Sequence, residues 1–209
     1  MRTLFEDPKE MDLITRVSFV LNEKGLKNMT MDDIAAELHV SKKTLYKYVK
    51  NRAELVKKCM QLRIGAEVEN REKISNLGLN AIEEHLKIIQ YTSEILSKSN
   101  DKIHTDLERF FPDAWQVIVD YKKNYLLPSI VRNIEKGQRE GLYCANVSAK
   151  IIATMYIAKI DLVFDGVTFP KGEFSFDKVL QAIVQHHLRG MATSQGIKVL
   201  EEITQVKFR

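Results

Sequence analysis

The sequence has few cysteines, prolines and glycines for its length. Two cysteines, four prolines and nine glycines occur among its 209 residues. Two cysteines are too few for a disulfide framework, and the scarcity of turn-forming residues disfavours a β-sandwich. The first eight residues are acidic and lack the apolar segment of an export signal. We therefore expect a cytoplasmic protein whose cysteines are reduced thiols.

The chain also lacks a long hydrophobic run. Its most apolar stretch, residues 151–164, is interrupted by Lys159 and Asp161. A membrane-spanning helix needs roughly 18 uninterrupted apolar residues. We therefore expect no membrane partner.

Motifs for catalysis and for metal binding are missing from the sequence. There is no G-x-S-x-G, no H-E-x-x-H, no phosphate loop and no Cys/His cluster at ligand spacing. His186 and His187 are adjacent, so on a helix their side chains point about 100° apart and cannot chelate one metal ion from one face. These absences predict that the chain is not an enzyme and holds no metal and no cofactor.

What the sequence does contain is typical of a helical globular protein. Hydrophobic residues make up 44% and charged residues 29% of the chain, which is an ordinary globular composition. Apolar residues recur at helical spacing, and no segment combines β-branched alternation with hairpin turn residues. The predicted fold class is all-α.

Four helix starts follow one another closely in the first 55 residues. Their predicted N-caps are Asp7, Thr30, Ser41 and Asn51. Only His39 and Val40 separate the end of the second helix from the cap of the third. Two short helices joined so tightly must cross at a large angle, which is the geometry of a helix-turn-helix.

The remainder of the chain is also expected to be helical. The pattern predicts a helix after Asn80 that ends at residues 99–101, a short helix at 102–110, a long helix at 112–136 with a bend at Pro128, an apolar helix from the N-cap Asn146 to Phe164, a helix from Ser175 to Met191, and a short helix after Gly196. We therefore expect an N-terminal three-helix domain at residues 1–55 and a larger helical domain at residues 56–209.

Positive charge is concentrated on the third predicted helix and its edge. Between residues 41 and 58, seven basic residues and one acid, Glu54, give a local charge of +6, against +4 for the whole chain. The basic residues are Lys42, Lys43, Lys47, Lys50, Arg52, Lys57 and Lys58. Leu45 and Val49 are four residues apart and can face the core, which leaves the lysines outside. The alternatives are a solvated charged face and a helix that enters the major groove of DNA; the two-residue turn favours DNA.

These residues resemble the DNA-binding signature of the TetR family of transcriptional regulators. From residue 30 to residue 55 the chain reads TMDDIAAELHVSKKTLYKYVKNRAEL, and the resemblance extends over roughly residues 8 to 58 in residue type and spacing. The chain departs from the family pattern at His39, where glycine is usual, and at Lys43, where a small residue is common. The resemblance implies a regulator, most simply a repressor, that binds a palindromic double-stranded DNA operator as a homodimer and is released by a small-molecule effector.

The resemblance also implies roles for single residues. Thr30 would hold a phosphate, Ser41 would open the recognition helix, Lys42, Lys43 and Thr44 would face base edges, Tyr46 would contact the backbone or a thymine methyl, Lys47 and Tyr48 would lie near phosphate, and Arg52 would clamp a phosphate. For Tyr46 and Tyr48 the alternative is packing against the first helix.

In the TetR family the second domain binds the effector and forms the dimer. The helices at 147–165 and 176–193 carry more apolar residues than one core face needs, which supports a dimer interface there, although burial within one domain is the alternative. Aromatic residues that could line an effector cavity are Phe110, Phe111, Trp115, Tyr121, Tyr125, Tyr156 and Phe164. Polar groups that could orient the effector are His85, His104, Gln116 and Asp161.

Three hypotheses compete. The first is the ligand-responsive transcription factor, which we expect to bind DNA with strong salt dependence. The second is an enzyme, for which turnover would survive mutation of Lys42 and Lys43. The third is a helical interaction module that uses its basic face on an acidic protein or a membrane surface. The sequence favours the first.

Overall fold

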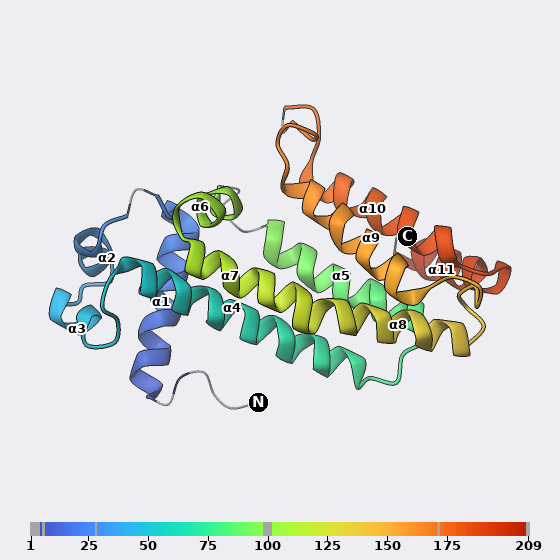
Figure 1. Cartoon of the computed structure of the whole chain (residues 1–209), viewed down its shortest axis with the longest axis horizontal. Helices are drawn as coiled ribbons and strands as arrows, with labels where there is room; N and C mark the ends of the chain where they lie inside the picture. Colours follow the sequence, from blue (N-terminus) through green and yellow to red (C-terminus); the bar gives the residue numbers. More distant parts are fainter. Residues whose placement is uncertain (1–4, 6, 28, 98–101, 171, 208–209) are drawn as a thin grey trace. The chain divides into compact units, whose positions relative to one another are not determined.

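The structure, a computed structural model, describes residues 5, 7–27, 29–97, 102–170 and 172–207, and Figure 1 shows their course. Helices dominate these residues, and the extended pairing among them is limited to a single antiparallel bridge between Tyr143 and Ala192. The prediction of an all-α protein is confirmed.

The chain forms two compact units. Unit 1 comprises Met1–Glu69 and Lys98–Tyr121, and unit 2 comprises Asn70–Ser97 and Lys122–Arg209. Helix α4 (Arg52–Ser75) contributes residues to both. The predicted domains, residues 1–55 and 56–209, were defined by their expected functions, whereas these units are defined by compactness. The predicted boundary therefore stays a prediction.

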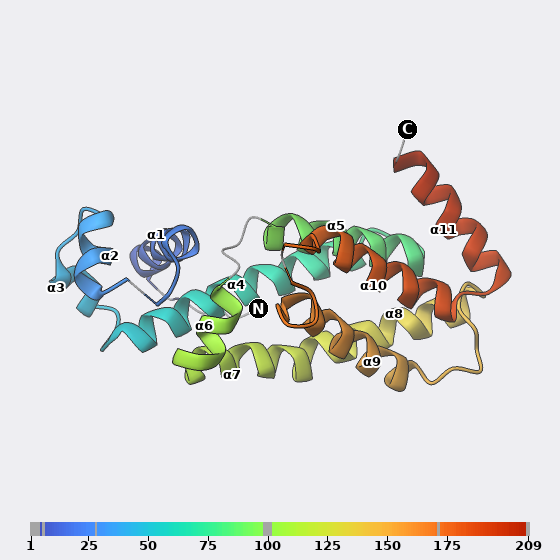
Figure 2. The same ribbon diagram turned by 90° about the horizontal axis from the view of Figure 1, so that it is seen from above.

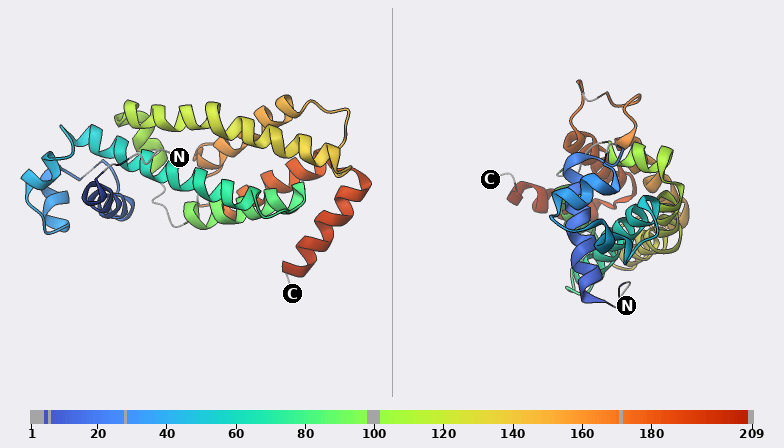
Figure 3. Two further views of the ribbon diagram at one scale, coloured as in Figure 1. Left: turned by 90° about the horizontal axis from the view of Figure 1, so that it is seen from below. Right: turned by 90° about the vertical axis from the view of Figure 1, so that its left-hand side faces the viewer.

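Unit 1 begins with the predicted succession of short helices. They are α1 (Pro8–Lys24), α2 (Met31–Glu37) and α3 (Lys42–Tyr46), and they lie beside the start of α4 (Figures 1 and 3). Each predicted N-cap accepts a hydrogen bond from the first turn of its helix, through Asp7, Thr30, Ser41 and Asn51. Such a cap stabilises a helix by about 1 kcal/mol, so the sequence sets all four helix starts correctly.

The inner faces of these helices meet in one apolar core. Its most deeply buried members include Ile14, Val17, Ile34, Leu45 and Leu55. Helices α6 (Ile103–Phe110) and α7 (Pro112–Tyr121) add Leu107, Phe111 and Ala114 to the same core. Burying one large aliphatic side chain stabilises the fold by about 1.5–3 kcal/mol. Helix α3 has only five residues, so packing through Leu45 holds it more than its own hydrogen bonds do.

Unit 2 is a helical assembly with its own apolar core. Its elements are the end of α4, α5 (Ala81–Ser97), a π-helical turn η1 (Lys122–Leu126), α8 (Leu127–Arg139), α9 (Ala149–Asp161), a 3-10 turn η2 (Leu162–Phe164), α10 (Phe176–Met191) and α11 (Ser194–Lys207). Helix α9 packs against α8 and α10, and α10 packs against α5 (Figure 2). The predicted start of α10 at Ser175 is confirmed, because its hydroxyl accepts the N–H of Lys178.

Three details of the sequence prediction for unit 2 were wrong. The long helix is interrupted at η1, before Pro128 and not at it. Proline removes a backbone hydrogen-bond donor, and the π-helical turn before it accommodates the changed hydrogen-bond pattern. The N-cap of α9 is Ser148 and not Asn146, since the Ser148 hydroxyl accepts from Ile151. Helix α11 has 14 residues and is not short. The predicted break at residues 99–101 lies outside the described residues.

A close approach in unit 2 requires a glycine. A Cβ added at Gly137, in the last part of α8, would overlap the ring of Tyr143. Tyr143 is 1% exposed, so its ring fills the space that the missing side chain leaves. The chain can therefore fold back directly after α8. After α10 it turns again into α11, which leaves the end of α10 in a different direction (Figure 2).

Candidate nucleic-acid interface

The turn between α2 and α3 is held by main-chain hydrogen bonds and one left-handed residue. The N–H of Leu38 bonds to the carbonyl of Ile34 at 3.1 Å, and the N–H of Val40 bonds to that of Ala35 at 3.0 Å. Between them His39 has φ = 54°. The left-handed conformation is the physical reason why glycine is usual at this position in the resembling family. A side chain in this region costs roughly 1–2 kcal/mol.

Helix α3 has one buried and one exposed face. Leu45 and Val49 are buried at 0% and 3% exposure, as the spacing predicted. Lys42, Lys43 and Lys47 are exposed on the other side. Tyr46 is also exposed, at 50%, so its ring does not pack into the core. The arrangement holds a cationic surface outward on a rigid base.

The predicted contacts at the helix starts already have local partners. The Thr30 hydroxyl donates to the Asp33 carboxylate at 2.6 Å and accepts the N–H of Asp33 at 3.2 Å. The hydroxyl and the main-chain N–H of Thr30 both donate to the Asp33 carboxylate, and these two bonds lower the pKa of Asp33. The Ser41 hydroxyl accepts the N–H of Thr44 at 3.1 Å and lies 2.9 Å from the Thr44 hydroxyl. Their roles at DNA stay predictions, and their capping roles are observed.

The three lysines of α3 have weak surface partners or none. Lys42 pairs with Asp32, and both side chains are more than half exposed; such a pair is worth about 0–1 kcal/mol. Lys43 has no ion-pair partner within the described part of the chain. The Lys47 ammonium donates to the Tyr48 hydroxyl at 3.2 Å, which raises the pKa of Lys47. All three ammonium groups can exchange these contacts for a phosphate at small cost.

Tyr48 packs against α1, which is the alternative that the sequence left open. Its hydroxyl donates to the Asp7 carboxylate at 3.0 Å, and its ring packs against the core of unit 1. Lys58 completes the joint, because its ammonium donates to the Tyr48 carbonyl at 2.7 Å and to the Glu10 carboxylate. The sequence offered no signal for the Lys58–Glu10 pair, whose members are 48 residues apart. The pair and Tyr48 fix the end of α3 to the start of α1.

Arg52 holds the segment that follows α1. Its guanidinium donates to the carbonyls of Leu26 and Lys27 and lies over the ring of Phe111 at 5.1 Å. Burial lowers the pKa of Arg52. The predicted phosphate clamp would use the same guanidinium, so it stays a prediction beside an observed structural role.

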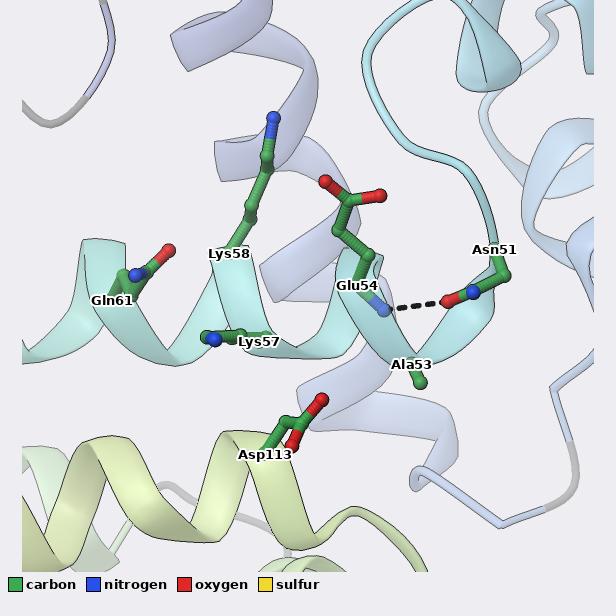
Figure 4. Close-up of a pocket in the computed structure, with 7 residues that line it drawn as sticks. All are labelled: Asn51, Ala53, Glu54, Lys57, Lys58, Gln61 and Asp113. Atoms are coloured by element: carbon green, nitrogen blue, oxygen red, sulfur yellow. Dashed lines mark hydrogen bonds between the residues drawn. The ribbon is translucent and has the colours of Figure 1, made fainter.

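A polar hollow of about 430 Å³ lies beside the start of α4 (Figure 4). Its lining residues are Asn51, Ala53, Glu54, Lys57, Lys58, Gln61 and Asp113. Asp113 comes from α7, and Glu54 and Lys58 point to the opposite side of α4 (Figure 4). The charge run indicated the lysines, but only the fold brings Asp113 to them. The acid offsets part of the positive charge at this edge of unit 1. We call the part of unit 1 formed by α1, α2, α3 and the start of α4 the head.

The predicted aromatic set is divided between the two units. Phe110, Phe111, Trp115 and Tyr121 belong to unit 1, and Tyr125, Tyr156 and Phe164 belong to unit 2. Phe110 is 48% exposed beneath the Lys27 ammonium, Phe111 lies in the unit 1 core, and Trp115 meets the edge of His104 at 4.8 Å. Phe164 packs against Phe176. Their roles in effector binding stay predictions.

Among the polar groups predicted for the effector, His85 is the one found in a buried cluster. Its Nε2 lies 3.1 Å from the Tyr156 hydroxyl. Asp161 pairs with Lys122 at 2.6 Å, and Gln116 donates to Asp120 at 2.9 Å. The sequence argued against a metal site at His186 and His187; His187 is buried, and its partners emerge only from the fold.

Two further features, a metal site and a membrane-spanning helix, are not found among the described residues. No group of three or more His, Cys, Asp or Glu side chains could hold a metal ion in that part of the chain. Over the same residues, no helix has the length and apolar character required to cross a bilayer.

Comparisons with known proteins agree with the geometry of the head. Residues 20–59 match the family model described as bacterial regulatory proteins, tetR family. An uncharacterized HTH-type transcriptional regulator of Bacillus subtilis (strain 168), YvaF, is 26% identical over 179 residues, which cover 84% of this chain and 92% of that protein.

Solved structures share the fold at low sequence identity. A transcriptional regulator from Saccharomonospora viridis in complex with choline has a TM-score of 0.72 at 16% identity, and the match covers 88% of this chain and 97% of that one. SmeT in a triclosan complex has a TM-score of 0.70 at 14% identity, and the match covers 90% and 93% of the two chains. The family model, the curated relative and the helix-turn-helix geometry together support the resemblance: residues 20–59 match the tetR family of bacterial regulatory proteins, and the chain over most of its length is similar to an HTH-type transcriptional regulator.

Proposed function

We propose that this regulator represses transcription by binding a palindromic operator as a homodimer, and that a small-molecule effector releases it. The observation that carries the proposal is the outward face of α3, where Lys42, Lys43 and Lys47 are exposed over a buried Leu45. A helix of this kind fits the major groove, and a dimer places two of them in successive grooves roughly 34 Å apart.

Base and phosphate contacts are divided over the head. Lys42, Lys43 and Thr44 lie in the first turn of α3, from which side chains reach base edges in helix-turn-helix proteins. Lys47 and Tyr46 are exposed further along and are assigned to the sugar–phosphate backbone. Tyr48, Arg52 and Thr30 are assigned mainly to holding the head together, with phosphate contact as a second role.

A homodimer is supported by an exposed apolar stripe that runs along α9 to the first residue of η2. Ile151, Met155 and Leu162 are 61%, 49% and 41% exposed, and their spacing puts them on one helix face. Contiguous exposed apolar surface marks an interaction site. The stripe lies within the predicted dimer helices at 147–165 and 176–193. Met155→Glu should yield monomers by light scattering, whereas Leu77→Glu, at an exposed position after α4, should leave the dimer intact; a dimeric Met155→Glu variant would rule the stripe out.

The effector is assigned to unit 2. Choline and triclosan are bound by the two regulators of similar fold, which supports a small-molecule site in a regulator of this fold. Helix α4 contributes residues to both units, so we assign it the transmission of the signal to the head. Because bacterial operators lie in the cytoplasm, the proposal also places the protein there.

Fluorescence anisotropy tests DNA binding. The purified protein should bind labelled DNA from the promoter of its own gene, and its affinity should fall about 10³-fold or more as salt rises from about 50 to 200 mM. Binding that ignores salt, or its absence at low salt, would contradict the proposal. Binding to anionic vesicles together with indifference to DNA would favour the interaction module instead.

A further inference from the structure

A cluster of aromatic and imidazole rings is buried in unit 2. His85 on α5, Tyr156 on α9 and His187 on α10 are each at most 7% exposed. Tyr156 stacks on His187 with ring centroids 3.9 Å apart, and its hydroxyl lies 3.1 Å from Nε2 of His85. The two imidazole centroids are 5.4 Å apart. We call these three residues the imidazole cluster.

The cluster contains a buried nitrogen without a partner. Nε2 of His187 is inaccessible to solvent and makes no hydrogen bond within the described residues. The Tyr143 hydroxyl is also buried and makes no hydrogen bond within the described residues. Tyr143 lies near enough to Tyr156 for the two to interact electrostatically. A buried polar atom left without a hydrogen bond costs about 1–3 kcal/mol, and native interiors rarely keep one without a use. These atoms are suited to a polar group of a bound molecule.

The charged groups that act on the two histidines are basic, whereas Glu140 and Glu84 act on the neighbouring Tyr143. Burial is the largest cause of the lowered pKa of both histidines; after it, His187 and Arg71 act on His85, and Lys159 and His186 act on His187. Arg71, on α4, is 7% exposed. The acid next to the cluster in sequence, Glu84, is turned toward Lys136 and Ser75. These surroundings favour an anion over a cation.

Apolar side chains accompany the polar rings on the same helices. Leu86 and Ile89 follow His85 on α5, Ile152 precedes Tyr156 by one helical turn, and Ile183 precedes His187 by one turn; all pack against the unit 2 core. A ligand held here would place one polar end among the rings and an apolar body among these aliphatic groups.

We propose that the imidazole cluster binds the acidic group of the effector, a small amphipathic acid, and that His187 takes up a proton from solvent as the acid binds. The protonated Nε2 then donates a hydrogen bond to the carboxylate, which satisfies the buried nitrogen and neutralises the buried charge. This inference rests on the proposed effector site and names the chemical class that the site selects.

Three probes with the same alkyl chain separate the headgroups: octanoate, 1-octanol and octylammonium. Calorimetry on the full chain without DNA should show octanoate binding, with octanol and octylammonium at least about tenfold weaker, since each charge-assisted hydrogen bond contributes about 1.5–3 kcal/mol. Octanoate affinity should rise toward about tenfold per pH unit between about pH 8 and pH 6, where the carboxylate stays ionised.

Adjacent histidines provide the matched control. His187→Phe keeps a ring against Tyr156 but removes the nitrogen, and it should lose about tenfold or more in octanoate affinity together with the pH dependence. His186→Phe changes an exposed neighbour whose effect on the pKa of His187 is the smallest of the three causes, so octanoate affinity and its pH dependence should change far less than in His187→Phe. Should His187→Phe fold poorly in thermal unfolding, His187→Gln retains a hydrogen-bonding amide and should bind octanoate without the pH dependence.

Failure of this inference is distinct from failure of the proposed function. The acid site would be overturned if octanol bound as tightly as octanoate or if octanoate did not bind. It would also be overturned if the His187 variants kept the pH dependence, because the species bound would then be the neutral acid. The promoter anisotropy assay contains no probe, so it judges the DNA-binding function independently.

Discussion

Unit 1 places its polar side chains at the margins of an apolar core, whereas unit 2 places several of them inside. Tyr48 binds Asp7, and Lys58 binds Glu10 and a main-chain carbonyl, at the edges of the head. His85 and His187 lie within the interior of unit 2. Marginal polar contacts fix one shape, and interior polar atoms without partners suit a ligand. The contrast matches a DNA-binding unit of fixed shape followed in the chain by a unit that responds to a ligand.

The largest effect should come from removing the base of α3. Leu45→Ala deletes a fully buried side chain and should lower the free energy of unfolding by about 2–5 kcal/mol. Tyr46→Ala, next in sequence and half exposed, should change it by about 0.5 kcal/mol or less. Urea denaturation of both variants checks the pair. Equal losses would mean that α3 is not held by its apolar face.

Acid should weaken unit 2 through His187. Burial is the main cause of a His187 pKa of about 4 in the folded protein, against 6.5 for an ordinary histidine. The unfolded chain therefore binds more protons between about pH 6.5 and pH 4, so stability falls as pH drops through that window. His187→Phe should remove this loss of stability at acid pH, which amounts to at most on the order of 3 kcal/mol.

The measurement is urea denaturation at a series of pH values. The difference in stability between His187→Phe and the unmodified protein should shift in favour of the variant below about pH 6.5. His186→Phe provides the exposed control. A pH-independent difference for His187→Phe would show that His187 is not held neutral by burial.

Single lysines should contribute smaller effects to DNA binding. Lys43→Ala should weaken binding by about tenfold, equivalent to about 1.4 kcal/mol, if the side chain reaches a base edge or a phosphate. The slope of log affinity against log salt should fall by about one if the contact is to phosphate. Lys87→Ala, at an exposed position on α5, should change neither quantity in the anisotropy assay. Equal effects of the two substitutions would place the interface elsewhere.

The smallest effect concerns the turn of the reading head. His39 is held at φ = 54°, so His39→Gly should relieve strain and stabilise the protein by up to about 1 kcal/mol, less the entropy that glycine adds to the unfolded chain. His39→Ala cannot relieve the strain and should not stabilise. Thermal unfolding of both variants gives the comparison; a more stable alanine variant would contradict it.

The same contrast explains what the sequence predicted. Capping residues and periodicity act locally, so the starts of α1 to α4 follow from neighbouring residues. The Lys58–Glu10 pair and the imidazole cluster join residues from distant parts of the chain. No local pattern marks such contacts, because tertiary packing alone selects which polar side chains meet.

The errors have physical causes of the same kind. Asn146 and Ser148 are both good N-caps, and the choice between them depends on where α9 packs. The π-helical turn before Pro128 depends on how α8 fits its neighbours. The sequence could not decide whether Tyr48 packs in the core or contacts DNA, because a tyrosine suits both roles. In the fold its hydroxyl donates to the carboxylate of Asp7, which fixes its position.

Lysine footprinting tests the central claim most directly. The protein is acetylated with and without its promoter DNA, and the modified lysines are read by mass spectrometry. Lys42, Lys43 and Lys47 on the exposed face of α3 should be protected by DNA, while Lys87 and Lys150 in unit 2 should react as before. Bound DNA that leaves the three α3 lysines fully reactive would contradict the account.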